Sequence, residues 1–200
     1  MKSAPTADRP DIFRQCCHFI CPGFRTDDAS RKVLNELFRW AEGCSPVYDS
    51  ARGFLLTGDY GTGKSTLMQI LNRYDWYIRG RTPGDYPIGG FRIDSASYVA
   101  NGYTLRGRDA LELYTYNGGN PRTVCFDELG REPLPAKYFG TELNVMQYIL
   151  QCRYELRSEC LTHLTTNLSL PELQQRYGGY IADRINEMFN VIELRGKSHR

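Results

Sequence analysis

The stretch Gly58-Asp59-Tyr60-Gly61-Thr62-Gly63-Lys64-Ser65 has the spacing G-x-x-x-x-G-K-[S/T]. That spacing is typical of a loop that binds phosphate groups. The apolar run 53–57 precedes it and predicts a buried parallel strand. The residues from Thr66 onward contain no helix breaker and predict a helix. A strand, a glycine-rich loop and a helix, in this order, are the structural context that such a loop requires.

Each residue type in the loop has a chemical reason. Glycines allow a tight bend that turns backbone N–H groups toward phosphate oxygens, and the helix N-terminus adds partial positive charge. We expect Lys64 to reach the β- and γ-phosphates and the Ser65 hydroxyl to bind Mg²⁺. The alternative is a glycine-rich turn that only caps a helix. The residues expected to contact the nucleotide are Gly58, Asp59, Tyr60, Gly61, Thr62, Gly63, Lys64, Ser65 and Thr66.

A second apolar run, 123–126, ends in two acidic residues, Asp127 and Glu128. Strand ends near a phosphate-binding loop commonly supply the metal-binding carboxylate. We therefore expect Asp127 to hold Mg²⁺, directly or through water, and Glu128 to orient or deprotonate the attacking water. The alternative is a strand that merely ends in two solvated acids.

Two further polar residues are candidates for the same site. Asn167 follows a strand predicted over 161–166, where its amide would contact the γ-phosphate and the water, although Asn is also common as a plain turn residue. Arg184 lies on a short helix predicted over 181–189. A cation there would stabilise transition-state charge as arginine fingers do, but spacing alone favours a surface arginine paired with an acid.

The remaining pattern alternates strands and helices and predicts an α/β fold with a parallel sheet. Residues 1–11 are predicted to be a loose tail, and 95–116 to be helical pieces broken at Gly102 and Gly107. The segment 12–24 gives no clear prediction, and Pro133 and Pro135 indicate a loop. The other predicted strands are 91–93 and 191–194, and the other predicted helices are 29–42, 141–159 and 171–177.

Composition excludes some classes of protein. Net charge is +2, so charge alone gives no argument for nucleic acid as a ligand. No apolar run is long enough to span a membrane, and the N-terminus lacks a signal-peptide core, so we expect a cytoplasmic protein with reduced cysteines. Cys16, Cys17 and Cys21 with His18 would make half of a metal site, but no second pair at zinc spacing is present, which favours ordinary packing.

Together these blocks resemble AAA+ ATPases of the DnaC/IstB type, which load replicative helicases or assist transposases. The resemblance covers roughly 24–200. It implies a three-layer P-loop fold of the AAA+ (ASCE) group, with a five-stranded parallel sheet of order 5-1-4-3-2 and no C-terminal helical lid. It also implies a tail and adenine-side segment at 1–23 and an ATPase domain at 24–200. The blocks that carry it are GDYGTGKST at 58–66, FDELG at 126–130, TTNL at 165–168, RYGGYIADRI at 176–185 and VIELRGKSHR at 191–200.

The resemblance also implies roles for these residues. Lys64 and Ser65 correspond to Walker A, Asp127 and Glu128 to Walker B, Asn167 to sensor 1, and Arg184 to a finger that acts on a neighbour's ATP. Slow ATP hydrolysis with Mg²⁺, stimulated by a partner or DNA, and an ATP-dependent homo-oligomer follow as expectations. The expected partners are a replicative helicase or a transposase, and single-stranded DNA.

Some features depart from the family pattern. Only 57 residues precede the phosphate-binding loop, which leaves little room for the N-terminal docking region of full-length relatives and counts against helicase loading. Tyr180 replaces an arginine common in relatives, and a second sensor arginine would have to be Arg195 or Arg200. A candidate single-strand patch, with a solvated face as the equal alternative, consists of Arg92, Tyr98, Tyr103, Arg106, Arg108 and Arg122.

Three functions therefore compete. The first is an ATP-hydrolysing accessory factor for replication or transposition. The second is a nucleotide-gated binding module with negligible turnover. The third, a small-molecule P-loop kinase, is disfavoured by the Asp127–Glu128 pair with a downstream Asn167.

Overall fold

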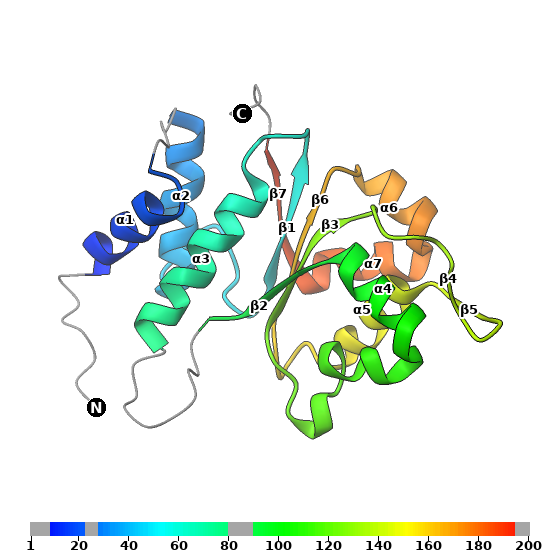
Figure 1. Ribbon diagram of the computed structural model, residues 1–200. Coiled ribbons are helices and arrows are strands. Elements are labelled where there is room, and N and C mark those ends of the chain that lie inside the picture. Colours follow the sequence, from blue (N-terminus) through cyan, green and yellow to red (C-terminus); the bar gives the residue numbers. More distant parts are fainter. Residues whose placement is uncertain (1–8, 23–27, 80–89, 195–200) are drawn as a thin grey trace. The chain divides into compact units, whose positions relative to one another are not determined.

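The computed structural model describes residues 9–22, 28–79 and 90–194 (Figure 1). Contacts divide the chain into two compact units, one of Met1–Ser50 with Ser65–Phe91 and one of Ala51–Lys64 with Arg92–Arg200. Part of the predicted adenine-side segment, and both Arg195 and Arg200, lie outside the described residues. Within the described residues, no helix has the length and apolar character needed to cross a bilayer.

The second unit contains a five-stranded sheet of order β2-β3-β6-β1-β7 in which every neighbouring pair is parallel. Numbered by their order among these five strands, this is the arrangement 5-1-4-3-2, so the predicted fold class and strand order are confirmed. The central strands are almost wholly buried, which explains their continuous apolar runs. The strands are β1 (Gly53–Gly58), β2 (Arg92–Ser95), β3 (Val124–Leu129), β6 (Thr162–Thr166) and β7 (Phe189–Leu194).

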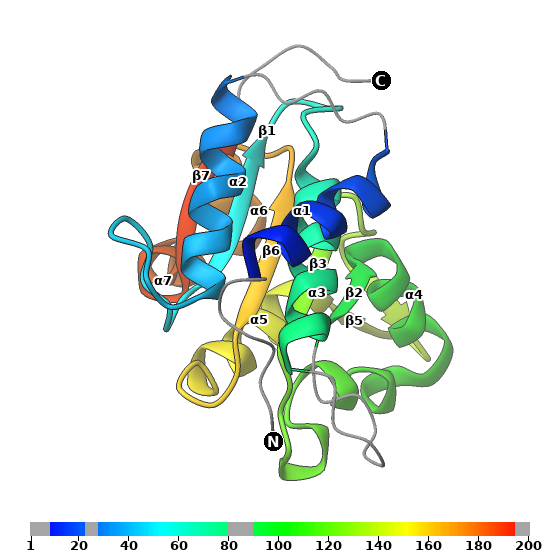
Figure 2. The same cartoon turned by 90° about the vertical axis from the view of Figure 1, so that its left-hand side faces the viewer.

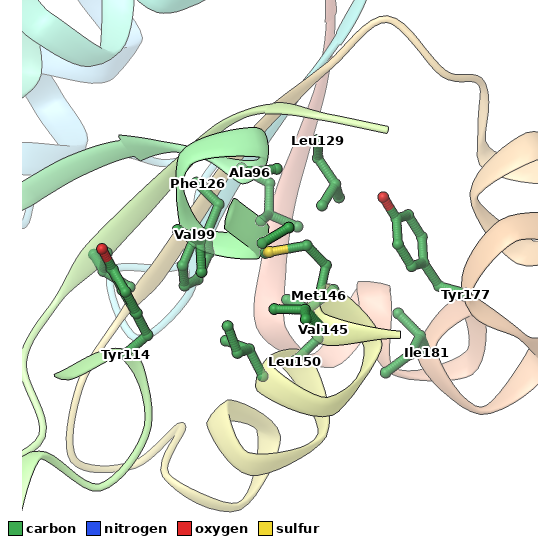
Figure 3. Packing of buried hydrophobic residues seen from close by; sticks show 14 of the residues in the cluster. Ala96, Val99, Tyr114, Phe126, Leu129, Val145, Met146, Leu150, Tyr177 and Ile181 are labelled. Carbon is green, nitrogen blue, oxygen red and sulfur yellow. The ribbon is translucent and has the colours of Figure 1, made fainter. Parts of the chain in front are cut away.

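Helices of the same unit cover one face of this sheet (Figure 1). The main core lies between that face and the helices, where Phe126 of β3 meets Val99 and Met146 (Figure 3). Burying such side chains contributes about 1.5–3 kcal/mol each, so this cluster is the main stabilising element of the unit. The helices are α4 (Ala96–Arg106), α5 (Val145–Glu155), α6 (Leu170–Tyr177) and α7 (Gly179–Met188), with short 3₁₀ turns η2 (Gly107–Ala110), η3 (Glu112–Tyr114) and η4 (Asn117–Gly119).

The first unit is helical, with α1 (Arg9–Ile20), α2 (Asp28–Ala41) and most of α3 (Lys64–Arg79) (Figure 2). The ring of Phe13 packs edge-on against Tyr74 at 5.1 Å between centroids. Glu42 accepts hydrogen bonds of 2.7 Å from both Arg9 and the Tyr74 hydroxyl. The predicted tail is therefore wrong for residues 9–11, because these contacts hold the first turn of α1 in place.

Three other predictions are corrected by the structure. Helix α4 continues through Gly102, where a Cβ would meet only Ala110, and ends at Gly107, whose φ is +62°. The loop predicted at Pro133 and Pro135 runs into a two-stranded hairpin, β4 (Ala136–Tyr138) and β5 (Thr141–Leu143).

The helix predicted from Thr141 begins instead at Val145. The Asn144 side chain caps it by accepting a 3.2 Å hydrogen bond from the Gln147 N–H. Thr141 and Glu142 instead pair with Tyr138 and Lys137 in the hairpin. A local polar cap and a cross-strand pairing thus set the helix start, and neither follows from helical periodicity alone.

Candidate functional site

The candidate residues of the second unit gather where three parallel strands end. β1 leads into the glycine-rich loop, β3 ends in the Asp127–Glu128 segment, and Asn167 directly follows β6. Since β6 pairs with both β1 and β3, these three carboxyl ends lie side by side at one edge of the sheet. Ligands of open α/β sheets bind at this edge.

The glycines of the loop adopt conformations that other residues avoid. Gly58, Gly61 and Gly63 have φ values of +123°, +78° and +88°. At Gly58 an added Cβ would also lie 2.1 Å from the Leu194 carbonyl oxygen. These positions require glycine, and left-handed backbone of this kind can turn successive N–H groups toward an anion.

Lys64 closes this loop. Its ammonium group donates hydrogen bonds to the carbonyl oxygens of Gly58 at 2.7 Å and Asp59 at 2.6 Å, and a longer one of 3.3 Å to the Thr62 hydroxyl. Burial lowers the pKa of Lys64, while Asp59 and, more weakly, the carboxylates of Asp127 and Glu128 oppose this shift. Lys64 and the two acids therefore act on one another electrostatically at the same edge of the sheet.

Ser65 and Thr66 are the second and third residues of α3. Backbone N–H groups in the first turn of a helix have no partner inside the helix and carry partial positive charge. The two hydroxyls thus stand at a helix end that favours an anion.

Thr165 of β6 organises the acidic pair, although sequence reasoning gave it no role. Its hydroxyl donates a hydrogen bond to the Asp127 carboxylate and accepts one of 3.0 Å from the Glu128 N–H. The side chain is buried, being 1% exposed. The sequence signal was present in the quoted block at 165–168, as a hydroxyl two residues before Asn167.

Glu128 sits at an irregular end of β3. Its φ is +56°, and the register between β3 and β6 shifts between Phe126 and Leu129. The Glu128 carboxylate accepts a 2.6 Å hydrogen bond from Arg131, whose guanidinium also lies 5.3 Å from the Tyr60 ring centroid. The hydrogen bond to Glu128 raises the pKa of Arg131. Arg131 is a second residue of the site to which sequence reasoning gave no role.

The turn that carries Asn167 is attached to the end of β3. The Thr166 hydroxyl donates to the Leu129 carbonyl at 2.7 Å and accepts from the Leu168 N–H at 3.0 Å. These bonds hold the Asn167 backbone beside the Asp127–Glu128 segment. Asn167 itself is half-buried.

Arg184 is placed elsewhere, on α7 against α5. Its guanidinium lies 3.6 Å from the Tyr180 ring centroid and 4.7 Å from that of Tyr154, and it donates to the Tyr180 carbonyl at 3.2 Å. Its buried Nε has no hydrogen-bond partner among the described residues. The structure therefore brings Lys64, Asp127, Glu128 and Asn167 together, and leaves the Arg184 guanidinium packed on the Tyr180 ring and near the Tyr154 ring.

The residues of the predicted single-strand patch differ in their exposure. Tyr103 is buried in the core and Arg92 is paired with Asp94, while Tyr98 is exposed, so the single-strand patch is only partly a free face.

All seven cysteines of the sequence are free thiols in the structure. No cluster of three or more metal-ligating His, Cys, Asp or Glu side chains occurs in the described part of the chain. Burial raises the pKa of Cys17 to about 11.

No protein-family model matches the sequence, and no curated protein matches it either. Solved structures do match. A DnaC helicase loader is 16% identical with a TM-score of 0.61, over 88% of this chain and 96% of the loader. DnaI is 18% identical with a TM-score of 0.62, over 94% of this chain and 93% of DnaI.

The chain has an AAA+ fold. At such low identity the likeness to these loaders concerns the fold alone. The replication initiator DnaA, solved with AMPPCP and single-stranded DNA, shares this AAA+ fold at 14% identity and a TM-score of 0.53. That match covers 88% of this chain and 49% of the initiator.

Proposed function

We propose that the chain binds ATP with Mg²⁺ and hydrolyses it to ADP and phosphate. The observation that carries this proposal is the shared carboxyl edge of β1, β3 and β6, where the loop that carries Lys64 and the Asp127–Glu128 pair lie and where the Thr165 hydroxyl bonds the Asp127 carboxylate and the Glu128 N–H. An ammonium group, a glycine loop and two carboxylates at one edge are the parts that phosphoryl transfer needs.

The residues of the loop suit a triphosphate. Lys64 is bonded to oxygens of its own loop, and a phosphate would offer it stronger, charged acceptors. Around Gly63, no atom of the described residues, its two chain neighbours aside, lies within 4 Å of the position that a Cβ would take, so the backbone there is open to a ligand. The nine residues from Gly58 to Thr66 would surround the phosphates.

Hard oxygen donors suit Mg²⁺, and the Ser65 hydroxyl and the Asp127 carboxylate are such donors. When bound, the metal would neutralise charge on the β- and γ-phosphates. Glu128 would accept a proton from, or orient, the attacking water, and Asn167 would hold that water or the γ-phosphate. Arg184 would complete the site of a neighbouring subunit, which explains why it is not at the sheet edge of its own chain.

The biological role we propose is that of an accessory ATPase in DNA replication or transposition, acting on a replicative helicase or a transposase. The DnaC and DnaI folds support a role in replication, with a helicase as the partner. The AMPPCP- and DNA-bound DnaA structure supports ATP and single-stranded DNA as ligands. Arg106, Arg108 and the exposed Tyr98 remain the candidate contacts to DNA.

One observation favours a second candidate, a nucleotide-gated switch with negligible turnover. The Glu128 carboxylate is already engaged by Arg131 at 2.6 Å. A glutamate that kept this partner in the nucleotide-bound state would have fewer acceptor sites left for the attacking water. ATP binding would then be the working step.

Nucleotide binding and phosphate release together decide between these functions. Lys64→Ala should lose ATP binding, whereas Glu128→Gln should bind ATP normally and release phosphate on the order of 100-fold more slowly than wild type. Wild-type release no faster than that of Glu128→Gln, with and without single-stranded DNA, would establish the switch. Wild-type protein that fails to bind MgATP would refute both.

A further inference from the structure

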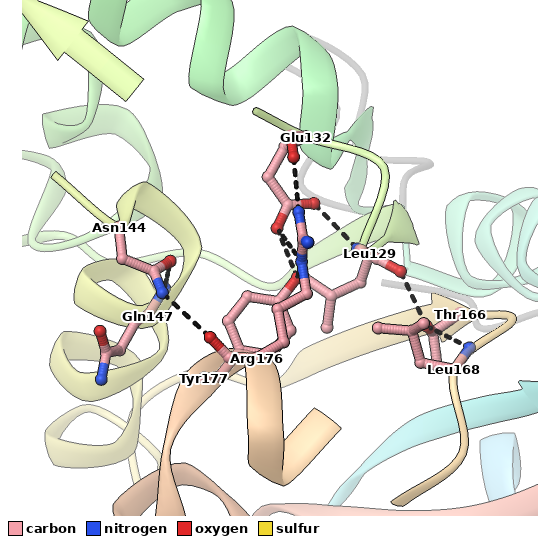
Figure 4. A network of polar contacts seen from close by, with 9 residues as sticks. Leu129, Glu132, Asn144, Gln147, Thr166, Leu168, Arg176 and Tyr177 are labelled. Atoms are coloured by element: carbon pink, nitrogen blue, oxygen red, sulfur yellow. Dashed lines mark hydrogen bonds and ion pairs between the residues drawn. The ribbon is translucent and has the colours of Figure 1, made fainter. Parts of the chain in front are cut away.

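A buried carboxylate lies just beyond the acidic pair, in the turn that follows β3. Glu132 is 3% exposed, and three groups donate hydrogen bonds to its carboxylate (Figure 4). One carboxylate oxygen accepts the Gly130 N–H at 2.8 Å, and the other accepts the Tyr177 hydroxyl and, at 3.4 Å, Arg176 Nε. Arg176 also donates to the Glu132 carbonyl at 2.5 Å.

Arg176 and Tyr177 come from the last turn of α6, which is itself held in place. The Arg176 carbonyl accepts a 3.3 Å hydrogen bond from the Asn144 side chain (Figure 4). The Tyr177 ring is 1% exposed within the main core. Burial of a charge is costly unless it is paired and hydrogen-bonded, and here the bonds to Arg176 and Tyr177 tie the turn to α6.

The same turn begins at Glu128 and has an unusual backbone conformation. Glu128 has a left-handed backbone, and its carbonyl accepts the Arg131 N–H at 3.2 Å. Gly130, at φ +103°, passes so close to Leu168 that a Cβ would lie 2.6 Å from a Leu168 methyl group. A left-handed conformation in a residue with a side chain persists only where its surroundings enforce it. Thr166 and Leu168 enforce it on one side of the turn, and Glu132 on the other.

We propose that Glu132, held by Arg176 and Tyr177, is a positioning residue for Glu128. It fixes the turn 128–132 so that the Glu128 carboxylate is aimed at the nucleotide. This rests on the proposed hydrolysis. The effect acts on the acid of the same chain, and not on the Arg184 that the chain offers to a neighbour.

Tyr177→Phe is the sharpest variant, because it removes one hydroxyl and leaves the ring in the core. Its kcat should fall about tenfold, since small misplacement of a catalytic group is costly, while KM and the Kd for ATP stay within about twofold. Tyr116→Phe removes a hydroxyl bonded to Glu155 at the surface and should leave kcat unchanged. Glu132→Gln should lower kcat in the same way, because the amide has one accepting oxygen where the carboxylate had two, and its NH₂ group would face a donor.

The neighbour's site provides the second readout. α7, which carries Arg184, begins directly after Tyr177 and Gly178. When Tyr177→Phe subunits are mixed with Arg184→Ala subunits, they should supply an intact Arg184 to neighbouring Arg184→Ala sites. Hydrolysis at those sites should recover as fully as it does with Lys64→Ala subunits. A merely structural role would lower this rescue together with kcat.

Each outcome then has a definite meaning. The inference is overturned if kcat is unchanged in both Tyr177→Phe and Glu132→Gln. It is also overturned if kcat falls together with weaker ATP binding or with lost rescue. Should Tyr177→Phe fail to fold, Glu132→Gln carries the test. If Glu128→Gln itself hydrolyses ATP like wild type, the proposed function fails, which is a result distinct from failure at Tyr177 alone.

Discussion

The Thr165 hydroxyl donates a hydrogen bond to the Asp127 carboxylate, and it accepts one of 3.0 Å from the Glu128 N–H. One buried side chain of β6 thereby orients the two acids that end β3. The two strands pair with an irregular register at this point, and the threonine bridges the irregularity. A hydroxyl suits this position because it both donates and accepts.

Thr165→Val should destabilise the protein and slow hydrolysis. Valine has nearly the same shape but leaves the Glu128 N–H without its acceptor, which costs about 1–3 kcal/mol when the group is buried. Denaturant unfolding measures the first effect and phosphate release the second. Thr104→Val removes an exposed hydroxyl that bonds the Asn101 carbonyl within α4, and serves as the control. Equal unfolding free energies for the two variants would contradict the role of Thr165.

Arg131→Ala should raise basal phosphate release. The ion pair with Glu128 holds the carboxylate before nucleotide binds, and its loss frees the acid to meet water. The increase should be small, on the order of threefold, because exposed ion pairs are weak. Arg157→Ala is the matched control, since Arg157 lies over Tyr154 away from the acids. A fall in release would instead show that Arg131 assists the reaction.

Local patterns account for much of the fold and part of the site. Apolar runs placed the five strands of the sheet, and the glycine spacing placed Lys64 at a strand end, because both signals lie within a few consecutive residues. The strand order came from the resemblance to a family and not from the patterns. The roles of Thr165, Arg131 and Glu132 were not predicted, since each depends on residues that meet only in the folded chain. The hairpin at 136–143 was missed because Pro135 and Gly140 indicate a loop as readily as a turn between strands.

Mixing variants should reveal whether Arg184 acts on a neighbouring subunit. Arg184→Ala and Lys64→Ala should each lack hydrolysis when alone. Mixed, they should recover part of it, because some interfaces would pair an intact loop with an intact arginine. Phosphate release across mixing ratios measures this. Arg157→Ala mixed with Lys64→Ala gives the reference curve, and no recovery at any ratio would remove Arg184 from the reaction.

Arg153→Met should strongly destabilise the chain, although Arg153 is remote from the acids. Its buried guanidinium donates to the carbonyls of Tyr114, Arg122 and Leu161 at 3.0, 2.9 and 2.6 Å. Loss of the donor leaves several acceptors unsatisfied, and the cost should be about 3–5 kcal/mol of unfolding free energy. Arg157→Met, at the surface of the same helix end, should cost far less. Similar losses for both would contradict this account.

The free energy of unfolding should fall as the pH is lowered below about 6.5, with His163 as one cause. This imidazole is buried in β6, and its Nδ1 accepts the Phe54 N–H at 3.0 Å. Burial, and secondly the charge of Arg153, lower the pKa of His163 from 6.5 to about 3. Between these values the unfolded chain binds a proton that the folded chain does not, so stability rises with pH and is complete above about 6.5.

The slope that this histidine contributes should approach about 1.4 kcal/mol per pH unit below pH 6. His163→Asn keeps an acceptor near the Phe54 N–H but cannot titrate. The free energy of unfolding, measured with denaturant between pH 8 and about pH 5, should therefore change less with pH for the variant than for wild type. The pH dependence that comes from the other titrating groups is common to both proteins and cancels in the comparison. Parallel curves for the two would mean that His163 binds a proton as readily in the folded chain as in the unfolded chain, against its burial and its acceptor role.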